Sequence, residues 1–297
     1  MALVVLIGDV ESYQSKFNLI DKEIKNGNIS VVATLLTDEV DYDILDDNIV
    51  VNSLDDIENV QFDYFIILDN NKLWYAILPD EYEFTQKIIP IHVFEIPYFD
   101  FRKYEQLMQN PPSIISRHCW GGILFNQLGL KFNSPFVNLF LLDSDFNKLS
   151  KNFSHYMRQE LVFEREEYEH NLNINYPIAK LDDISIYFNH YTSFEEAKKK
   201  WDERKERINY DNLLFETTTE NRGIALDFDS ISLPHKLCFH NGNIDSPNII
   251  DFSKFMINQK PGSLGMLVNN TANGKIPYFD MIDLLLNFNY KSRIHFE

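Results

Sequence analysis

The first hundred residues alternate between short apolar runs and polar segments with helical spacing. Leu3 to Ile7 is a continuous apolar run, which is typical of a strand covered on both faces in a parallel sheet, and Ile29 to Leu36 is expected to be a second buried strand. Between them, residues 11–26 carry apolar side chains at helical spacing. Shorter apolar runs at 48–51 and 62–68 continue the pattern. This rhythm predicts an open parallel sheet of the Rossmann type with helices on both faces.

Three weaker signals complete this half of the chain. A short helix is expected over residues 53–58, with Ser53 as its N-cap. Residues 88–94 resemble a further strand, and residues 98–109 carry the apolar spacing of a helix.

The clearest break in the chain is Asn110-Pro111-Pro112, because proline continues neither a helix nor a central strand. We place a domain boundary there, which gives a first domain at 1–111 and a second at 112–297. The expected fold class is α/β. The first domain is Rossmann-like, and the second is an α/β/α domain whose sheet is mostly parallel or mixed.

The second domain repeats the alternation less regularly. Strands are expected at 113–116, 135–142, 161–164, 184–188, 211–216 and 236–239. Helices are expected at 123–128, 143–157, 193–208 and 278–287, and a solvated acidic run at 164–169. The helix after Ser193 is the best marked, because Ser193 and Glu196 form a capping box.

The turn after the first strand lacks a dinucleotide fingerprint. A Rossmann site needs Gly-x-Gly-x-x-Gly so that the backbone can approach a pyrophosphate. Here only Gly8 is present, and Asp9 and Glu11 would repel phosphate. We therefore expect the fold without NAD, and the sequence indicates no other cofactor.

Charge and composition narrow the classes of function. The formal net charge is −18, which disfavours binding to nucleic acid. Cys119 and Cys238 are too few and too far apart for a disulfide framework. The N-terminus lacks the basic region of a signal peptide, and no apolar run approaches the ~20 residues of a membrane helix. We expect a cytoplasmic protein without membrane insertion, whose oligomeric state the sequence does not indicate.

The richest chemistry follows the strand at 113–116, in Arg117-His118-Cys119-Trp120-Gly121-Gly122. A strand, a polar turn and a helix start present side chains and free backbone N–H groups at one edge of a sheet. Cys119 is the candidate nucleophile, because a helix N-terminus stabilises a thiolate. Its base or charge partner could be His118, Arg117, His190 or His235.

A plainer interpretation of the same turn stays open. Cys119 can be a small buried side chain and Trp120 a core anchor. Gly121 and Gly122 can expose N–H groups to a diphosphate or carboxylate, or they can serve tight helix-on-strand packing.

Two further groups of polar residues are candidates for ligand binding. Lys200, Arg204 and Arg207 lie at i, i+4 and i+7, so they form a cationic stripe that could hold a nucleotide-sugar phosphate or pair with acids. Asp182 and Asp183 precede a strand that His190 follows, but Asp-Asp-Ile is not Asp-x-Asp, so we assign no metal site.

Aromatic residues near these groups could stack on sugar rings or belong to the core. They are Trp120, Trp201, Tyr187 and Tyr191.

The motifs from Ser113 to Phe239 resemble a bacterial domain of unknown function whose members are commonly described as exopolysaccharide- or capsule-biosynthesis proteins. The resemblance is carried by Ser116-Arg117-His118-Cys119-Trp120-Gly121-Gly122, Asn133-Ser134-Pro135-Phe136, Phe188-Asn189-His190-Tyr191 and the Trp201-x-x-Arg204-x-x-Arg207-Ile208-Asn209 run. It implies a two-domain α/β protein linked to cell-surface sugar polymers, which transfers a group to a glycan.

Two functions follow as expectations. The first is a transferase acting on an activated sugar or polysaccharide, with a nucleotide sugar or polysaccharide as its ligand. Its catalytic residues would be Cys119, His118 and His190, and its ligand-binding residues Arg117, Trp120, Gly121, Gly122, Asp182, Asp183, Lys200, Trp201, Arg204 and Arg207. The second is a non-catalytic binding or scaffold subunit of a polysaccharide-synthesis system. An NAD-dependent oxidoreductase would rest on the first domain's fold alone.

Overall fold

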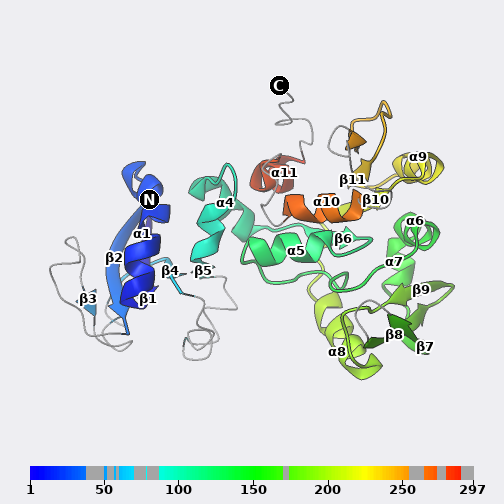
Figure 1. Ribbon diagram of the computed structural model, residues 1–297, viewed down its shortest axis with the longest axis horizontal. Helices are drawn as coiled ribbons and strands as arrows, with labels where there is room; N and C mark the ends of the chain where they lie inside the picture. Colours follow the sequence, from blue (N-terminus) through cyan, green and yellow to red (C-terminus); the bar gives the residue numbers. More distant parts are fainter. Residues whose placement is uncertain are drawn as a thin grey trace. The chain divides into compact units, whose positions relative to one another are not determined.

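The computed structural model describes residues 1–37, 50–51, 57, 60–69, 78, 87–169, 174–253, 264–272 and 279–288 (Figure 1). The chain divides into two compact units. Unit 1 comprises Met1–Gln109 and Gln127–Leu130, and unit 2 comprises Asn110–Asn126 and Lys131–Glu297. Both units combine helices with parallel sheets, so the predicted α/β class is confirmed.

Unit 1 contains a parallel sheet with the strand order β3-β2-β1-β4-β5. The strands are β1 (Ala2–Gly8), β2 (Ile29–Leu36), β3 (Val50–Val51), β4 (Tyr64–Ile67) and β5 (Ile88–Pro90). The helices are α1 (Val10–Lys25), the 3-10 helix η3 (Ile91–Glu95) and α4 (Phe101–Gln109). This order is that of a Rossmann-type sheet, as the apolar runs predict. The helix expected at 53–58 lies outside the described residues, apart from Ile57.

The core of unit 1 explains the continuous apolar runs. Val4, Val5, Leu6 and Ile7 of the central strand β1 have no exposed surface, so neither face of the strand meets water. The strand expected at 88–94 stops at Pro90, because proline has no N–H to donate to a ladder.

Unit 2 contains a parallel sheet with the order β12-β11-β10-β6. Its strands are β6 (Ser113–Ser116), β10 (Leu213–Thr219), β11 (His235–His240) and β12 (Ile249–Asp251). Because all four run the same way, their carboxyl ends share one edge.

Helices cover both faces of this sheet. Ile115, Phe215 and Cys238 face a core that includes residues of α6 (Asp143–Lys151) and α9 (Arg222–Ser230). Phe239 on the other face contacts Trp120 of α5 (Trp120–Gln127) and lies near Phe279, which precedes α11 (Met281–Asn287). The helix α10 (Leu264–Ala272) packs against β10. The α/β/α prediction therefore holds.

A small antiparallel sheet, β7-β8-β9, completes unit 2. Its strands are β7 (Leu161–Glu169), β8 (Ile174–Leu181) and β9 (Ile184–Tyr187). The helix α8 (Phe194–Lys205) follows, and Ser193 Oγ accepts from the N–H of Glu196 at 3.2 Å, so the predicted cap is confirmed.

Several expected elements of unit 2 were wrong. Residues 135–142 form a loop with a single bridge from Phe140 to Tyr187, because their apolar side chains fill the core without a partner strand. The helix at 143–157 breaks at Asn152 into α6 and α7 (Phe153–Tyr156). The strand expected at 161–164 continues through the acidic run at 164–169 as β7, and the run is largely exposed, as predicted. The sequence patterns did not indicate α9, α10 or β12.

Candidate functional site

The carboxyl edge of the unit 2 sheet brings together ionisable side chains from the turn after β6 and from β10. Strand β6 ends at Ser116, and Arg117, His118 and Cys119 follow before α5 begins at Trp120. Glu216 of β10 stands opposite Ser116 in the parallel register.

Glu216 is the residue that sequence reasoning missed. Its side chain has no exposed surface, and its carboxyl accepts from Ser116 Oγ and, at 3.0 Å, from Thr218 Oγ1. Burial raises the pKa of Glu216 from the ordinary 4.5 to about 7, although the two hydroxyls and Arg117 oppose the shift. An acid in a strand of otherwise apolar and threonine residues was the available signal, since carboxylates are seldom fully buried.

His118 lies against this acid as a neutral ring. Its Nε2 is 3.8 Å from Glu216 Oε1, and its Nδ1 accepts from the N–H of Trp120 at 3.4 Å. This acceptor role places the proton of the neutral ring on Nε2. Burial and the charge of Arg117 lower the pKa of His118 to about 3. His118 can therefore donate a hydrogen bond, but it does not carry a charge near neutral pH.

Cys119 and His190 meet although 71 residues separate them. The distance between Cys119 Sγ and His190 Nε2 is 3.6 Å, and His190 is exposed on the loop that follows β9. Burial and the neighbouring Glu216 raise the pKa of the Cys119 thiol. The expected stabilisation of a thiolate by the helix N-terminus is therefore outweighed, and Cys119 is a neutral thiol that must lose its proton before it can attack.

Arg117 is engaged by the fold. One terminal nitrogen pairs with Asp143 Oδ1 at 2.9 Å and donates to the carbonyl of Leu141 at 3.3 Å. The other donates to the carbonyl of Thr218 at 2.5 Å. The guanidinium thus ties the turn to β10 and to the start of α6, and its two terminal nitrogens already bond protein acceptors.

The Trp-Gly-Gly sequence serves packing. Trp120 is fully buried, and its Nε1 donates to Thr271 Oγ1 of α10 at 3.3 Å. A Cβ on Gly121 would lie 2.8 Å from Ile114 Cγ2, and one on Gly122 would lie 3.0 Å from Val137 Cγ1. The plainer interpretation of these residues therefore accounts for them without a ligand.

The cationic stripe divides into an outward and an inward part. Lys200 pairs with Glu203 at 3.7 Å on the surface. Arg204 is buried, and its NH1 donates to Tyr191 Oη at 2.8 Å. Arg207 is half-buried and lies in the turn after α8, because the helix ends at Lys205, so the predicted stripe does not continue on one helix face to Arg207. Trp201 is a core residue, so it has no free face for a sugar ring.

Asp182 and Asp183 lie away from the cysteine. They form the turn between β8 and β9, whereas His190 follows the other end of β9. Asp182 Oδ2 is 2.7 Å from His155 Nε2, and Asp183 Oδ1 accepts from Tyr156 Oη at 2.6 Å. Across the described part of the chain, no group of three His, Cys, Asp or Glu residues could hold a metal ion.

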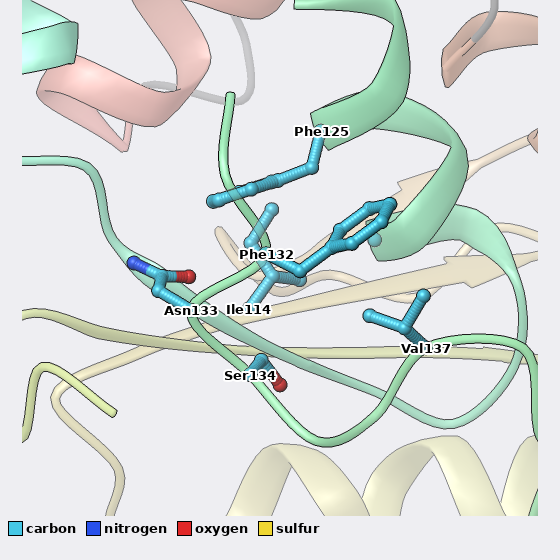
Figure 2. Close-up of a pocket in the computed structure, with 7 residues that line it drawn as sticks. Ile114, Phe125, Phe132, Asn133, Ser134 and Val137 are labelled. Atoms are coloured by element: carbon cyan, nitrogen blue, oxygen red, sulfur yellow. The ribbon is translucent and has the colours of Figure 1, made fainter. Parts of the chain in front are cut away.

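A small pocket lies beside α5, with about 160 Å³ of empty space that includes open solvent (Figure 2). Apolar side chains dominate its lining, which consists of Ile114, Gly121, Phe125, Phe132, Asn133, Ser134 and Val137. The volume open to the centre of a water-sized sphere is only about 10 Å³, so the pocket has room for about one water molecule.

No helix in the described ranges is both long enough and apolar enough to traverse a bilayer.

Comparison with known proteins gives two matches. A family model described as a domain of unknown function (DUF1919) matches residues 90–288. A relative from Haemophilus influenzae, described as an uncharacterized protein, is 33% identical over 182 residues, which are 60% of this chain and 84% of the relative.

Proposed function

The chain belongs to the DUF1919 family, and we propose that it is a transferase acting on an activated sugar or a polysaccharide. The observation that carries the proposal is the 3.6 Å approach of Cys119 Sγ to His190 Nε2 at the carboxyl edge of a parallel sheet. A thiol beside an imidazole is the arrangement that covalent group transfer uses. The resemblance to exopolysaccharide-biosynthesis proteins supports the choice of a sugar as acceptor.

An acyl group fits this pair best, because a thiolate attacks a carbonyl carbon readily. His190 Nε2 takes the thiol proton, and Cys119 Sγ forms a bond to the acyl carbon while the bond to the leaving group breaks. The leaving group takes the proton from His190. A sugar hydroxyl then gives its proton to His190, its oxygen bonds the acyl carbon, and the carbon–sulfur bond breaks. The thiolate takes the proton back.

Glu216 tunes the first of these steps. Its negative charge opposes the thiolate of Cys119, and its own pKa of about 7 places the loss of that charge near neutral pH. Protonation of Glu216 therefore makes proton transfer from Cys119 to His190 easier.

The covalent intermediate can be tested by intact-mass spectrometry. The chain is incubated with acyl-CoA donors and nucleotide sugars, and we expect an adduct on Cys119. Cys119→Ser should abolish it, and His190→Asn should slow its formation about 100-fold or more, the usual worth of a general base.

The second cysteine provides the matched control. Cys238 is fully buried on β11, so Cys238→Ser should form the adduct as the wild type does. An adduct that persists in Cys119→Ser, or the absence of any adduct with all donors, would contradict the proposal.

One observation favours a binding or scaffold subunit instead. Strand β7 lies at the edge of its sheet and exposes Val162, Phe163 and Tyr168, the kind of apolar surface that partners cover. Under this alternative, Cys119→Ser would bind purified polysaccharide as tightly as the wild type, and no donor would modify the protein.

A further inference from the structure

We infer that Arg204 and Arg207 of unit 2 form a binding site for a diphosphate group. The inference rests on the proposed function for the identity of the ligand, which would be the acyl-CoA donor or a nucleotide sugar as the acceptor. It does not rest on that function for the site itself.

The first observation is a buried cation with neutral partners only. Arg204 is 8% exposed, and its NH1 donates to Tyr191 Oη at 2.8 Å and to the carbonyl of Val137 at 3.5 Å. Its Cζ lies 5.0 Å from the ring centroid of Phe132. No carboxylate of the described residues pairs with it. A buried charge without a counter-ion lowers stability, so its retention calls for an anion from outside the chain.

The second observation is another unpaired guanidinium nearby. Arg207 Nε is buried and has no hydrogen-bond partner among the described residues. Burial and the charge of Arg204 lower the pKa of Arg207, and Glu203 only partly opposes this shift. Two like charges held together at a partly buried place are relieved by a ligand that carries negative charge on two groups.

The outward cations of the same helix provide an internal comparison. Lys198 pairs with Asp202 at 2.8 Å, and Lys199 and Lys200 lie within 4.0 Å and 3.7 Å of Glu203. The chain has 45 acidic and 27 basic residues, so carboxylates are abundant. These three lysines of α8 thus have acid partners, whereas Arg204 and Arg207 form no ion pair with an acid among the described residues.

The position of the arginines suits a ligand of the proposed reaction. Tyr191, which binds Arg204, directly follows His190, the partner of Cys119. Phe132 and Val137, which also contact Arg204, line the pocket beside α5 (Figure 2). A diphosphate at the arginines would therefore leave the rest of its ligand near the reactive pair and the pocket.

Arg204 can be substituted without leaving its hydrogen-bond partners, Tyr191 and Val137, unpaired. Tyr191 Oη itself donates to the carbonyl of Val137 at 3.2 Å, so both groups keep a hydrogen bond in an Arg204→Met variant. Methionine also retains the packing against Phe132. We expect this variant to fold.

The test is titration calorimetry of the full chain with pyrophosphate, at ionic strength fixed with sodium chloride. We expect saturable binding that weakens about tenfold or more in Arg204→Met and in Arg207→Gln, the loss expected for a charge-assisted contact. Lys199→Gln, an exposed change on the same helix, should bind as the wild type does. No binding by the wild type, or undiminished binding by a folded Arg204→Met, would overturn the inference.

Two further experiments distinguish the candidate ligands and separate this inference from the proposed function. Competition by UDP-glucose or by acetyl-CoA identifies the source of the diphosphate, and competition by neither overturns the assignment. Cys119→Ser should bind pyrophosphate with unchanged affinity, because the anion site does not use the thiol. A site that binds pyrophosphate in a protein that forms no adduct would sustain this inference while removing the proposed transfer.

Discussion

In each unit the first strand of a parallel sheet leads through a short turn into a helix, and the polar groups of the two turns serve different purposes. At the first, β1 leads into α1 in unit 1. Asp9 Oδ1 accepts from the N–H of Ser12 at 2.6 Å, and Lys16 Nζ donates to the carbonyl of Leu68 at 2.8 Å. A Cβ on Gly8 would lie 2.9 Å from Leu68 Cβ. Each polar group here serves the local fold.

At the second turn, β6 leads into α5 in unit 2. The polar groups of this turn make contacts that the local fold does not need. His118 lies against the buried acid Glu216, and Cys119 meets His190 from a distant loop. The cap position before α5 holds a thiol, a weak hydrogen-bond acceptor, where α1 has a carboxylate. A shared strand-to-helix topology determines where a functional site can form. Residues that do not stabilise the local fold, such as a buried acid or a thiol at a helix cap, indicate where a site is present.

The largest expected effect comes from Glu216, the buried acid that the first turn lacks. Its carboxyl keeps a proton up to about pH 7 in the folded protein but to only about 4.5 when unfolded. Between these values the folded state binds more protons, so its stability falls as the pH rises. The free energy of unfolding of the wild type should fall by about 3 kcal/mol between about pH 4.5 and about pH 7, and Glu216→Gln should remove this decrease.

Urea unfolding of both proteins from about pH 4.5 to about pH 7.5 measures this difference. Titration of His118, whose pKa is lowered by folding, makes stability rise with pH in both proteins. Subtracting the stability of one protein from that of the other at each pH removes most of this contribution. Glu195→Gln, on the exposed surface of α8, is the control and should follow the wild type. If the free energies of unfolding of wild type and Glu216→Gln change with pH in parallel, then titration of Glu216 does not affect stability and the prediction is wrong.

Local sequence patterns predicted elements in both units. The buried run in β1 indicated a covered central strand, and the Ser193–Glu196 capping box marked the start of α8. Both signals depend only on neighbours along the chain. The strand wrongly expected at 135–142 shows the limit of such patterns, because an apolar loop and an apolar strand look alike until a partner strand is known.

The candidate site depended on pairings that no local pattern contains. Glu216 is a candidate site residue only because β10 lies between β6 and β11, which buries its carboxyl beside Ser116. Lys200 and Arg204 share a helix face by spacing, yet one pairs with an acid at the surface and the other turns into the protein. Burial of a helix face was visible in the sequence, but the identity of its neighbours was not.

The second prediction tests what the two turns share. Gly8→Ala and Gly121→Ala each place a methyl group less than 3.0 Å from a side-chain carbon, so each should destabilise its unit by about 2 kcal/mol. Gly265→Ala on α10 meets open space and should be neutral or stabilising by up to about 1 kcal/mol. Thermal and urea unfolding check these values. If Gly121→Ala unfolds with the stability of the wild type, then the Trp-Gly-Gly sequence is not explained by tight packing.

The smallest expected effect separates the turns most directly, because it compares the residue before each helix. Asp9→Ala removes the hydrogen bond to the N–H of Ser12 and should cost about 1 kcal/mol of stability. Cys119→Ser is nearly isosteric and supplies a better capping atom, so it should stay within about 0.5 kcal/mol of the wild type while it abolishes adduct formation. Urea unfolding of the two variants beside the wild type decides the matter. If Cys119→Ser loses as much stability as Asp9→Ala, then the thiol is part of the scaffold and the second turn differs from the first in composition alone.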